Sequence, residues 1–333
     1  IDEWLTGLRQ RPFPAQVDNT MRGEFLRCPT AFKRSFLNCL ASQSPSVHLH
    51  AGGAFAKGLE IARLSFHDEG RSVPEAMRDG LAAIIQGYGA FVPVPTKQGD
   101  KSLDNVIKAF AEYFARYPLD TDVLQTFRAA NGKLMVEFTF AIPTEVRNPS
   151  TGDPILYAGR FDRLATRGDA LFVTDEKTAT QLGEQWASQW DLESQFTGYH
   201  FAALHYGYPV AGCTVRGVGL LKSKITFAET TLHKGQWQLD RWWEQLHKDL
   251  HRMVAAYEAW DWDLALAKGS CGAYGGCLYK IMCESPEPER WLNQYRIRRW
   301  DPLAPDHGEN LLSNPTLTRQ PSDDLAIDLD KLT

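Results

Sequence analysis

Two aspartates and a lysine lie at hairpin spacing in the middle of the chain. Asp162 falls within one apolar-rich run, and Asp175 and Lys177 end the next one. An Arg-Gly-Asp turn signal at 167–169 separates the two runs, which is typical of a β-hairpin. Because side chains alternate along a strand, Asp175 and Lys177 share one face and Glu176 points to the other. We therefore expect two carboxylates and a lysine to meet at one end of the hairpin.

This combination of residues suits the metal-dependent hydrolysis of a phosphate ester. The oxygens of Asp162 and Asp175 can hold a hard divalent cation, because Mg²⁺ typically takes one or two carboxylates and keeps several waters. Such an ion would polarise the phosphate and lower the pKa of a water, while Lys177 would orient that water or stabilise charge on the phosphate. A D-x-K triplet on its own usually forms a salt bridge at a sheet edge. Its position after G-x-D-R favours the chemical interpretation here.

Three motifs in sequence order carry a resemblance to known nucleases. G-R-F-D-R at 159–163 and T-D-E-K-T at 174–178 are followed by Q-F-T-G-Y at 195–199. In a helix, Gln195 and Tyr199 lie on one face because positions i and i+4 are neighbours. Together the motifs resemble the core of the PD-(D/E)xK nucleases, in particular their RecB-like branch.

The resemblance implies a fold class and a metal site. The implied fold is α/β, with a restriction-endonuclease-like α-βββ-α-β core, an inserted helical lobe and a cysteine-stapled C-terminal region. Asp162 and Asp175 would bind Mg²⁺ or Mn²⁺, with the backbone carbonyl of Glu176 as a third ligand. Lys177 would position the attacking water. Because only the backbone of Glu176 would take part, its replacement by alanine should have a mild effect.

The resemblance also implies contacts to DNA and a further acidic residue. Three side chains would contact the strand near the scissile phosphate: Arg163, Gln195 and Tyr199. The family often shows G-x-x-x-H-x-x-E on its first helix, but here Gly53 is followed by Lys57 and Glu60. The expected metal-binding histidine is therefore a lysine. Glu60 would face the site through water and His50 is a candidate substitute for the histidine, whereas a solvent-exposed Glu–Lys face is the alternative. Glu137 resembles a family glutamate on the first strand, although a polar edge residue would look the same.

Four cysteines form a second set of candidate ligands. Cys28 precedes a proline, and Cys271, Cys277 and Cys283 follow at two five-residue gaps among glycines. This arrangement resembles the one-plus-three cysteines that hold a [4Fe–4S] cluster in some RecB-like nucleases, including CRISPR-adaptation and phage relatives. The longer first gap departs from the two-residue gap that is frequent there. Zn²⁺ is the alternative, because four thiolates suit either centre. Two other cysteines are expected to take no part: Cys39 and Cys213.

Composition limits the class of protein. The chain has 333 residues, of which 43% are hydrophobic and 23% charged, as in globular proteins. No apolar run approaches the length of a transmembrane helix, and nothing at the start resembles a signal peptide. Six cysteines fit a reducing compartment, so we expect the cytoplasm of a bacterial or phage-infected cell. The net charge of −5 argues weakly against nucleic-acid binding, but a local basic groove can coexist with it.

Periodicity and motifs divide the chain into five expected parts. They are an N-terminal arm (1–20), a helical part with the first cysteine (21–130), the nuclease core (131–232), a C-terminal helix with the cysteine cluster (233–300) and an acidic tail (301–333). Expected helices cover 21–42 on both sides of a proline, 51–63, 73–92, 101–117, 184–206 and 235–262. Expected strands cover 133–143, 155–166, 170–177, 212–222 and 224–232.

These features predict a metal-dependent DNA exonuclease that hydrolyses phosphodiester bonds in phage or recombination and repair processing. Its partners would be DNA and other recombination or phage proteins. One alternative is a nuclease-fold module with weakened catalysis, which holds DNA or a protein partner in a larger complex. A second alternative is a zinc-stapled structural component of a repair or phage complex.

Overall fold

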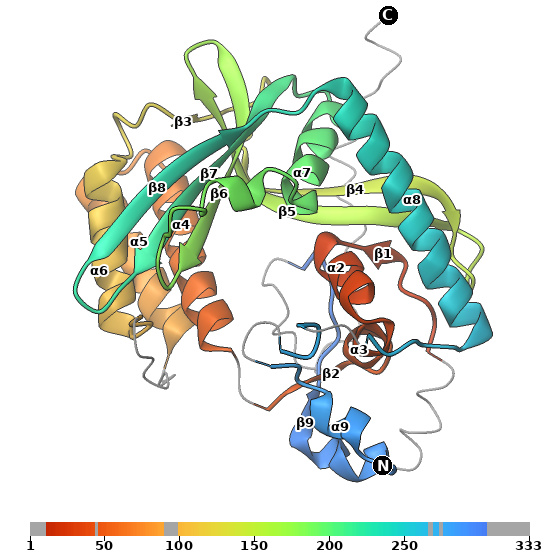
Figure 1. The fold of residues 1–333 in the computed structure, drawn as a ribbon. Helices are drawn as coiled ribbons and strands as arrows, with labels where there is room; N and C mark the ends of the chain where they lie inside the picture. Colours follow the sequence, from red (N-terminus) through yellow and green to blue (C-terminus); the bar gives the residue numbers. More distant parts are fainter. Residues whose placement is uncertain (1–10, 44–45, 90–98, 266–268, 273–275, 305–333) are drawn as a thin grey trace, which may run out of the picture. The chain divides into compact units, whose positions relative to one another are not determined.

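The computed structural model describes residues 11–43, 46–89, 99–265, 269–272 and 276–304. Within these residues the chain forms a mixed α/β fold with a seven-stranded sheet and a separate two-stranded sheet (Figure 1). Two compact units interleave along the chain. The first unit is built from residues 1–44, 139–159 and 240–333, and the second from residues 45–138 and 160–239.

The predicted hairpin is confirmed. β5 (Pro154–Arg167) and β6 (Ala170–Ala179) pair antiparallel, with Arg163 opposite Thr174. Gly168 in the turn between them has a φ of +58°, which glycine adopts without steric cost. The hairpin therefore follows from a local turn signal between two apolar runs.

The large sheet is mixed because a helix crosses over between two parallel strands. β6 pairs in parallel with β7 (Val210–Leu220), and the connection contains α7 (Ser194–His205). A parallel pair needs such a crossover, whereas a tight turn joins antiparallel strands. β4 (Val136–Arg147) pairs with β5, and β8 (Ile225–Leu232) pairs antiparallel with β7. The order β4-β5-β6-α7-β7 matches the three strands, helix and strand that the sequence predicts.

The helix expected over residues 184–206 is shorter than predicted. Only Ser194–His205 is α-helical, and a 3₁₀ turn at Ser188–Trp190 precedes it. Trp186 lies over β7, where a Cβ added to Gly217 would come within 2.4 Å of the indole ring. The apolar residues before α7 are therefore placed by packing rather than by helical periodicity.

The helical lobe predicted before the sheet is confirmed. α4 (Val47–His67), α5 (Val73–Tyr88) and α6 (Leu103–Arg116) gather beside β6, β7 and β8 (Figure 1). They share an apolar core that includes Phe55 and Phe110 and extends to the buried side chains of β7. The lobe thus covers one face of the sheet in the second unit.

Two glycines allow α4 and α5 to approach closely. A Cβ on Gly58 would lie 2.4 Å from Cγ1 of Ile84, and a Cβ on Gly80 would lie 2.7 Å from the carbonyl oxygen of Gly58. α4 also touches β6, because a Cβ on Gly52 would meet Oγ1 of Thr178 at 3.0 Å. These contacts fix α4 against the strand that carries the D-E-K triplet.

The first unit is mainly helical apart from its share of β4 and β5. It holds α2 (Asn19–Arg27), α3 (Pro29–Phe32) and most of α8 (Gln236–Ala259). Arg22 and Asp249 join α2 to α8 through a buried ion pair of 2.7 Å. The remaining elements of this unit are short: η1 (Lys33–Leu37), β2 (Leu40–Ser42), α9 (Lys280–Glu284), η4 (Pro288–Gln294) and β9 (Tyr295–Ile297).

Parts of the expected arm and tail belong to the fold. β1 (Gln16–Val17), from the expected arm, pairs in parallel with β5, and β3 (Gln125–Thr126) pairs with β5 elsewhere along its length. Leu303 and Ala304, at the start of the expected tail, are buried. Residues 305–333 of that tail lie outside the described residues.

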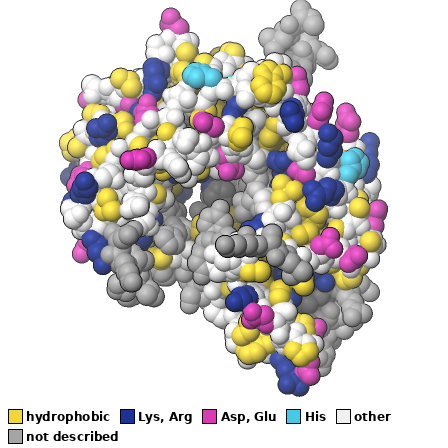
Figure 2. All heavy atoms as spheres, in the orientation of Figure 1, with side chains coloured by type: hydrophobic (Ala, Val, Ile, Leu, Met, Phe, Trp, Pro, Cys, Tyr) yellow, Lys and Arg dark blue, Asp and Glu magenta, His cyan; other side chains and the backbone are white. Residues whose placement is uncertain are grey.

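Charged side chains of both signs are interspersed on the face that Figure 2 shows. None of the described helices is long and apolar enough to cross a membrane.

Candidate active site

The D-E-K triplet on β6 alternates as predicted. Lys177 and Asp175 lie on one face, with Nζ of the lysine 2.8 Å from Oδ1 of the aspartate. Glu176 points to the other face and pairs with Arg63, whose Nη2 lies 2.5 Å from Oε1. The Glu176 side chain is buried in this ion pair. This burial argues against the mild effect expected for its replacement by alanine.

The hairpin brings Asp162 of β5 next to the triplet. Its Oδ2 accepts a hydrogen bond of 2.8 Å from the backbone N–H of Glu176. Burial raises the pKa of Asp162 well above its usual range, and the charges of Asp175, Glu176 and Glu137 raise it further. Burial also raises the pKa of Asp175, although Lys177 lowers it. The two predicted metal ligands are thus close together and repel one another.

Two glutamates extend this acidic site. Glu137, near the start of β4, has a φ of +51°, a conformation that is uncommon outside glycine and concentrates at functional sites. Burial raises its pKa to about 7, Arg160 lowers it from a distance of 2.7 Å, and the charge of Glu60 raises it. Glu60 on α4 bonds to Nζ of Lys57 at 2.9 Å. Glu60 therefore lies within electrostatic reach of Glu137, as expected for a residue that faces the site.

The acidic site offers carboxylate oxygens, which are suitable ligands for a divalent cation. Four carboxylates from four elements lie close enough for each to raise the pKa of a neighbour or to have its own pKa raised: Glu60, Glu137, Asp162 and Asp175. A cation would relieve their mutual repulsion. In the part of the chain that the structure describes, no group of three or more His, Cys, Asp or Glu residues is already arranged to hold a metal ion. Mg²⁺ needs only one or two carboxylates with waters, so Asp162 and Asp175 satisfy its chemistry.

Lys177 remains a cation in this surrounding. Burial alone would lower its pKa, but the neighbouring charges of Asp175 and Asp162 outweigh burial and raise it. Its Nζ also lies 5.7 Å from the centre of the Phe196 ring, at the start of α7. A protonated lysine can donate hydrogen bonds to a water or a phosphate, but it cannot act as the base.

α7 brings the two residues of the Q-x-x-x-Y motif together. Nε2 of Gln195 donates a hydrogen bond of 2.7 Å to the hydroxyl of Tyr199. The Tyr199 ring is buried and packs edge-on against Phe161 of β5, with 5.7 Å between ring centres. The half-buried Gln195 is therefore the more accessible of the two for a nucleic-acid strand.

Two predicted roles conflict with the positions of the side chains. Arg163 is only 3% exposed, and its guanidinium donates to Thr174 and to the carbonyl oxygen of Leu124, both at 3.0 Å. This interior position is inconsistent with the DNA contact predicted for Arg163. His50 lies 2.8 Å from the carbonyl oxygen of Tyr88 and contacts its ring, which argues against its role as the substitute metal ligand.

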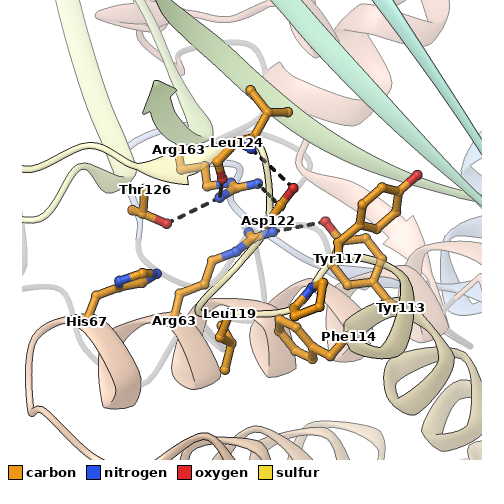
Figure 3. Close-up of a pocket in the computed structure, with 11 residues that line it drawn as sticks. Arg63, His67, Tyr113, Phe114, Tyr117, Leu119, Asp122, Leu124, Thr126 and Arg163 are labelled. Atoms are coloured by element: carbon orange, nitrogen blue, oxygen red, sulfur yellow. Dashed lines mark hydrogen bonds and ion pairs between the residues drawn. The ribbon is translucent and has the colours of Figure 1, made fainter. Parts of the chain in front are cut away.

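A small cavity on the Glu176 side of β6 is not a nucleotide site. It is lined by side chains from α4, α6 and β5, among them Arg63, Tyr113 and Arg163, together with Asp122 (Figure 3). Its volume of about 10 Å³ admits about one water molecule. The candidate chemistry therefore belongs to the opposite face of β6.

The candidate cysteine ligands lie in the first unit but are not assembled as a cluster. All six cysteines of the chain are free thiols. Cys28 is buried in an apolar cluster against which Cys277 also packs. Sγ of Cys283 accepts a hydrogen bond of 2.9 Å from Arg34, and Cys271 is exposed. Among the described residues, these thiols are not grouped as three or more ligands of one metal ion.

The two cysteines expected to take no part lie elsewhere. Sγ of Cys39 accepts a hydrogen bond of 2.8 Å from Arg11. Cys213 is buried on β7, with its Sγ 3.3 Å from the carbonyl oxygen of Phe196. Neither shares the apolar cluster of Cys28 and Cys277.

A family model for the PD-(D/E)XK nuclease superfamily matches residues 23–284. The chain belongs to this superfamily. The matched residues include α4, β4, β5 and β6, which carry the acidic site, and α7, which carries Gln195 and Tyr199. Superfamily membership indicates a phosphodiesterase, a divalent metal is typical of the family, and the family implies a DNA substrate.

Two solved structures resemble this chain with low TM-scores. A candidate exonuclease from Eubacterium rectale is 11% identical, with 75% of this chain and 85% of that chain covered and a TM-score of 0.41. A protein called SSO0001 is also 11% identical, with 70% and 84% covered and a TM-score of 0.30. Both scores are too low to support an argument about activity. No curated protein matches the chain.

Part of the surroundings of the triplet has only a weak signal in the sequence. Glu137 is an acidic residue in an otherwise apolar alternation, which was a usable signal for a place in the site. Arg63 and Tyr113, which hold Glu176, were not singled out at all. Arg63 follows Glu60 by three positions on one helix, and that spacing alone does not show what a buried arginine contacts.

Proposed function

We propose that this protein is a divalent-metal-dependent deoxyribonuclease of the exonuclease type. The observation that carries the proposal is the adjacency of Asp162 and Asp175 on paired strands, with Lys177 bonded to Asp175. The resemblance of the three motifs to the RecB-like branch supports an exonuclease in phage or recombination and repair processing. Six free thiols suit the reducing cytoplasm of a bacterial or phage-infected cell.

The surroundings of each side chain indicate the role that it would take in the reaction. Asp162 and Asp175, with the backbone carbonyl of Glu176, would hold Mg²⁺ or Mn²⁺, which supplies a polarised phosphate oxygen and a more acidic water when bound. Lys177 donates a hydrogen bond that orients the water, and its charge offsets the charge that develops on the phosphate. The charges of Asp175 and Asp162 raise the pKa of Lys177 and so favour its protonated form, which suits this donor role.

The remaining motif residues would hold the substrate and the site. Gln195 would contact the DNA strand near the scissile phosphate, and Tyr199 would orient Gln195 through their hydrogen bond. Glu60 would reach the metal through a water. The Lys57 ammonium beside Glu60 occupies the place of the family histidine and leaves one fewer direct ligand.

Digestion of end-labelled linear DNA and closed circular DNA tests the proposal. With Mn²⁺ or Mg²⁺ we expect loss of linear DNA from its ends, intact circles and no reaction after chelation. Cleavage of the closed circles would show that the enzyme is an endonuclease rather than an exonuclease. DNA binding without cleavage in any metal would favour the alternative, a module of a larger complex with weakened catalysis.

We also propose that Cys28, Cys271, Cys277 and Cys283 bind a [4Fe–4S] cluster, with Zn²⁺ as the alternative. Cys28 and Cys277 border one apolar cluster, and the charges of Cys277 and Cys283 both raise the pKa of Tyr295, although burial contributes most. Arg34 beside Cys283 would offset the negative charge of a thiolate-bound centre.

Anaerobic purification followed by iron, sulfide and zinc analysis tests the cysteine proposal. We expect a brown protein that bleaches when Cys277 is replaced with serine and keeps its colour when Cys39 is replaced. A colourless protein with one zinc would support the alternative centre. A protein with neither iron nor zinc would overturn both.

A further inference from the structure

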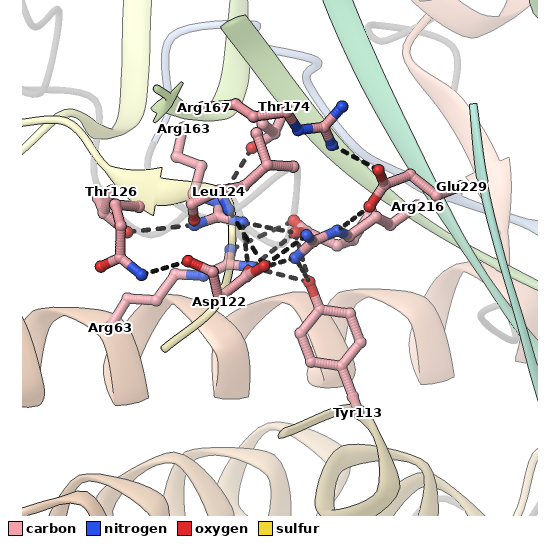
Figure 4. A network of polar contacts seen from close by, with 12 residues as sticks. Arg63, Tyr113, Asp122, Leu124, Thr126, Arg163, Arg167, Thr174, Arg216 and Glu229 are labelled. Atoms are coloured by element: carbon pink, nitrogen blue, oxygen red, sulfur yellow. Dashed lines mark hydrogen bonds and ion pairs between the residues drawn. The ribbon is translucent and has the colours of Figure 1, made fainter. Parts of the chain in front are cut away.

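A buried ion network surrounds Glu176 on the face of β6 opposite Asp175 and Lys177. Figure 4 shows the polar contacts of this network. It combines three arginines with three acidic residues and a tyrosine: Arg63, Arg163, Arg216, Asp122, Glu176, Glu229 and Tyr113. Arg216 is the largest of the fully buried side chains among the described residues. Charges are rarely buried to this extent without a structural reason.

Glu176 is held at both carboxylate oxygens. Oε1 accepts hydrogen bonds from Arg63 at 2.5 Å and from the hydroxyl of Tyr113 at 2.8 Å, and Oε2 accepts from Arg63 at 3.2 Å. The side chains of Arg63 and Glu176 are 4% and 1% exposed. A two-pronged guanidinium–carboxylate contact fixes direction as well as distance. The Glu176 side chain is therefore locked in one orientation.

The backbone of the same residue supports the acidic site. Its N–H donates to Oδ2 of Asp162 at 2.8 Å, and its chain neighbours on either side are Asp175 and Lys177. A rotation or shift of Glu176 would displace all three groups together, because they share one stretch of backbone. Locking the side chain of Glu176 on one face thus holds Asp162, Asp175 and Lys177 on the other.

We propose that Arg63 and Tyr113 are positioning residues that set the geometry of the metal site through Glu176. This inference rests on the proposed nuclease function. A buried ion pair is weak support for stability, since apolar residues of similar volume often replace it without loss. What the contact supplies is a fixed orientation, and groups that orient metal ligands typically change metal affinity or activity by about 10–100-fold when they are removed.

The network offers a matched control that is remote from the triplet. Glu229 accepts a hydrogen bond of 2.9 Å from Nε of Arg216 and pairs with Arg167 at 2.5 Å. In the described structure these arginines, rather than Glu176, are its contacts. Replacing Glu229 with glutamine therefore disturbs the same network without releasing the locked carboxylate.

The test uses the full chain with Tyr113→Phe, Arg63→Met, Arg63→Lys and Glu229→Gln. Tyr113→Phe removes one hydroxyl beside a cavity that admits water, so the fold should survive. Calorimetric titration with Mn²⁺ measures metal affinity without reference to turnover, and steady-state cleavage of linear DNA separates kcat from KM. Thermal unfolding confirms that each variant is folded.

We expect Arg63→Met and Tyr113→Phe to weaken Mn²⁺ binding and lower kcat by about 10–100-fold, with KM for DNA little changed. Arg63→Lys should recover part of the loss, and Glu229→Gln should match wild type in both measurements. Folded Arg63→Met or Tyr113→Phe with wild-type Mn²⁺ affinity and kcat would overturn the inference. If Arg63→Met does not fold, the Mn²⁺ affinity and kcat of Tyr113→Phe alone test the inference.

The two proposals fail in different ways. A wild-type protein that neither binds Mn²⁺ nor cleaves DNA would overturn the proposed function, and the inference with it. A wild-type protein that does both, with variants indistinguishable from it, would overturn only the positioning role of Arg63 and Tyr113. An equal loss in Glu229→Gln would show that the whole network acts through stability, which also contradicts that role.

Discussion

At the scale of single residues, Glu176 links β6 to the interior of the protein. Burial alone would raise its pKa, but the charges of Arg63 and Arg163 outweigh burial and hold its pKa well below the usual range. We predict that Glu176→Ala lowers the free energy of unfolding by about 3–5 kcal/mol, because it leaves Arg63 buried without its partner. Urea denaturation beside wild type measures the loss, and an alanine variant of wild-type stability would contradict the prediction.

Glu229→Gln again serves as the comparison. The Glu229 side chain is 27% exposed, so water screens its ion pairs with Arg167 and Arg216. A partly exposed pair contributes about 0–1 kcal/mol, and glutamine keeps a hydrogen-bond acceptor at the same place. A loss in this variant as large as in Glu176→Ala would show that position within the network does not matter.

Asp18, which caps α2, should make the folded protein less stable as the pH rises. Burial raises the pKa of its carboxyl from 3.8 to about 6, although hydrogen bonds from Met21 and Trp300 lower it. The folded protein then holds this proton more tightly than the unfolded chain does. The stabilisation is therefore complete below pH 3.8 and is lost as the pH rises through about 6.

We predict that wild type loses stability relative to Asp18→Asn as the pH rises from about 4 to about 7. Asparagine can still accept the N–H of Met21 but does not become charged, so the difference between the two proteins isolates this one group. Urea denaturation across that pH range measures it. A difference that does not change with pH would show that the carboxyl titrates alike in both states.

The placement of Asp162, Asp175 and Lys177 was predictable because its signals are local. It follows from a turn and an alternation that can be read directly along the chain. Arg63 and Tyr113 were not predictable, since they reach Glu176 from 113 and 63 residues away in the sequence. A local pattern does not reveal which buried arginine meets which carboxylate.

At the scale of elements, the contact between α4 and α5 determines where Glu60 and Arg63 stand. A Cβ on Gly58 would lie 2.4 Å from Cγ1 and 2.6 Å from Cδ1 of Ile84. We predict that Gly58→Ala costs about 1–3 kcal/mol of stability through overpacking, as chemical denaturation would show. A stabilised Gly58→Ala protein would mean that the two helices separate easily.

Gly53 on the same helix supplies the matched control. A Cβ there would meet nothing within 4 Å. Alanine in a helix interior is favoured over glycine by about 0.5–1 kcal/mol, so Gly53→Ala should stabilise the protein. Opposite signs for two identical substitutions on α4 would locate the effect at the contact with α5.

Elements with a clear period were predicted well, and those set by distant contacts were not. The hairpin, the lobe helices and α8 match their expected ranges within a few residues. β1 was missed because a strand of two residues is too short to show an alternation of apolar and polar side chains. Its pairing with β5 also depends on a partner about 140 positions away. The start of α7 was misplaced because Trp186 packs on Gly217 instead of continuing the helix.

At the scale of the whole molecule, the C-terminal residues account for most of the net negative charge. Residues 305–333 hold six acidic and two basic side chains, so removing them changes the net charge from −5 to −1. Truncation after Ala304 keeps the buried Leu303 and Ala304 in place. If residues 305–333 compete with DNA, the truncated protein should bind DNA more tightly than the full chain at low salt.

The salt dependence of that difference distinguishes competition from folding. Exposed charges more than about 10 Å apart are screened at about 0.1 M salt, so the advantage of the truncated protein should fade as salt rises. Fluorescence anisotropy with labelled DNA at several salt concentrations measures both proteins. Equal affinity at every salt concentration would contradict the competition.

The cleavage rate as a function of Mn²⁺ concentration, for wild type and Asp175→Asn, tests the account most directly. Asparagine removes one of two repelling carboxylate charges, but it also removes the charge that pairs with Lys177. Thermal unfolding of the variant beside wild type therefore shows whether it is folded. We predict saturable, Mn²⁺-dependent degradation of linear DNA by wild type and no detectable cleavage by folded Asp175→Asn. Wild-type cleavage that persists in a chelator, or an Asp175→Asn protein that cleaves like wild type, would contradict the assignment of the active site.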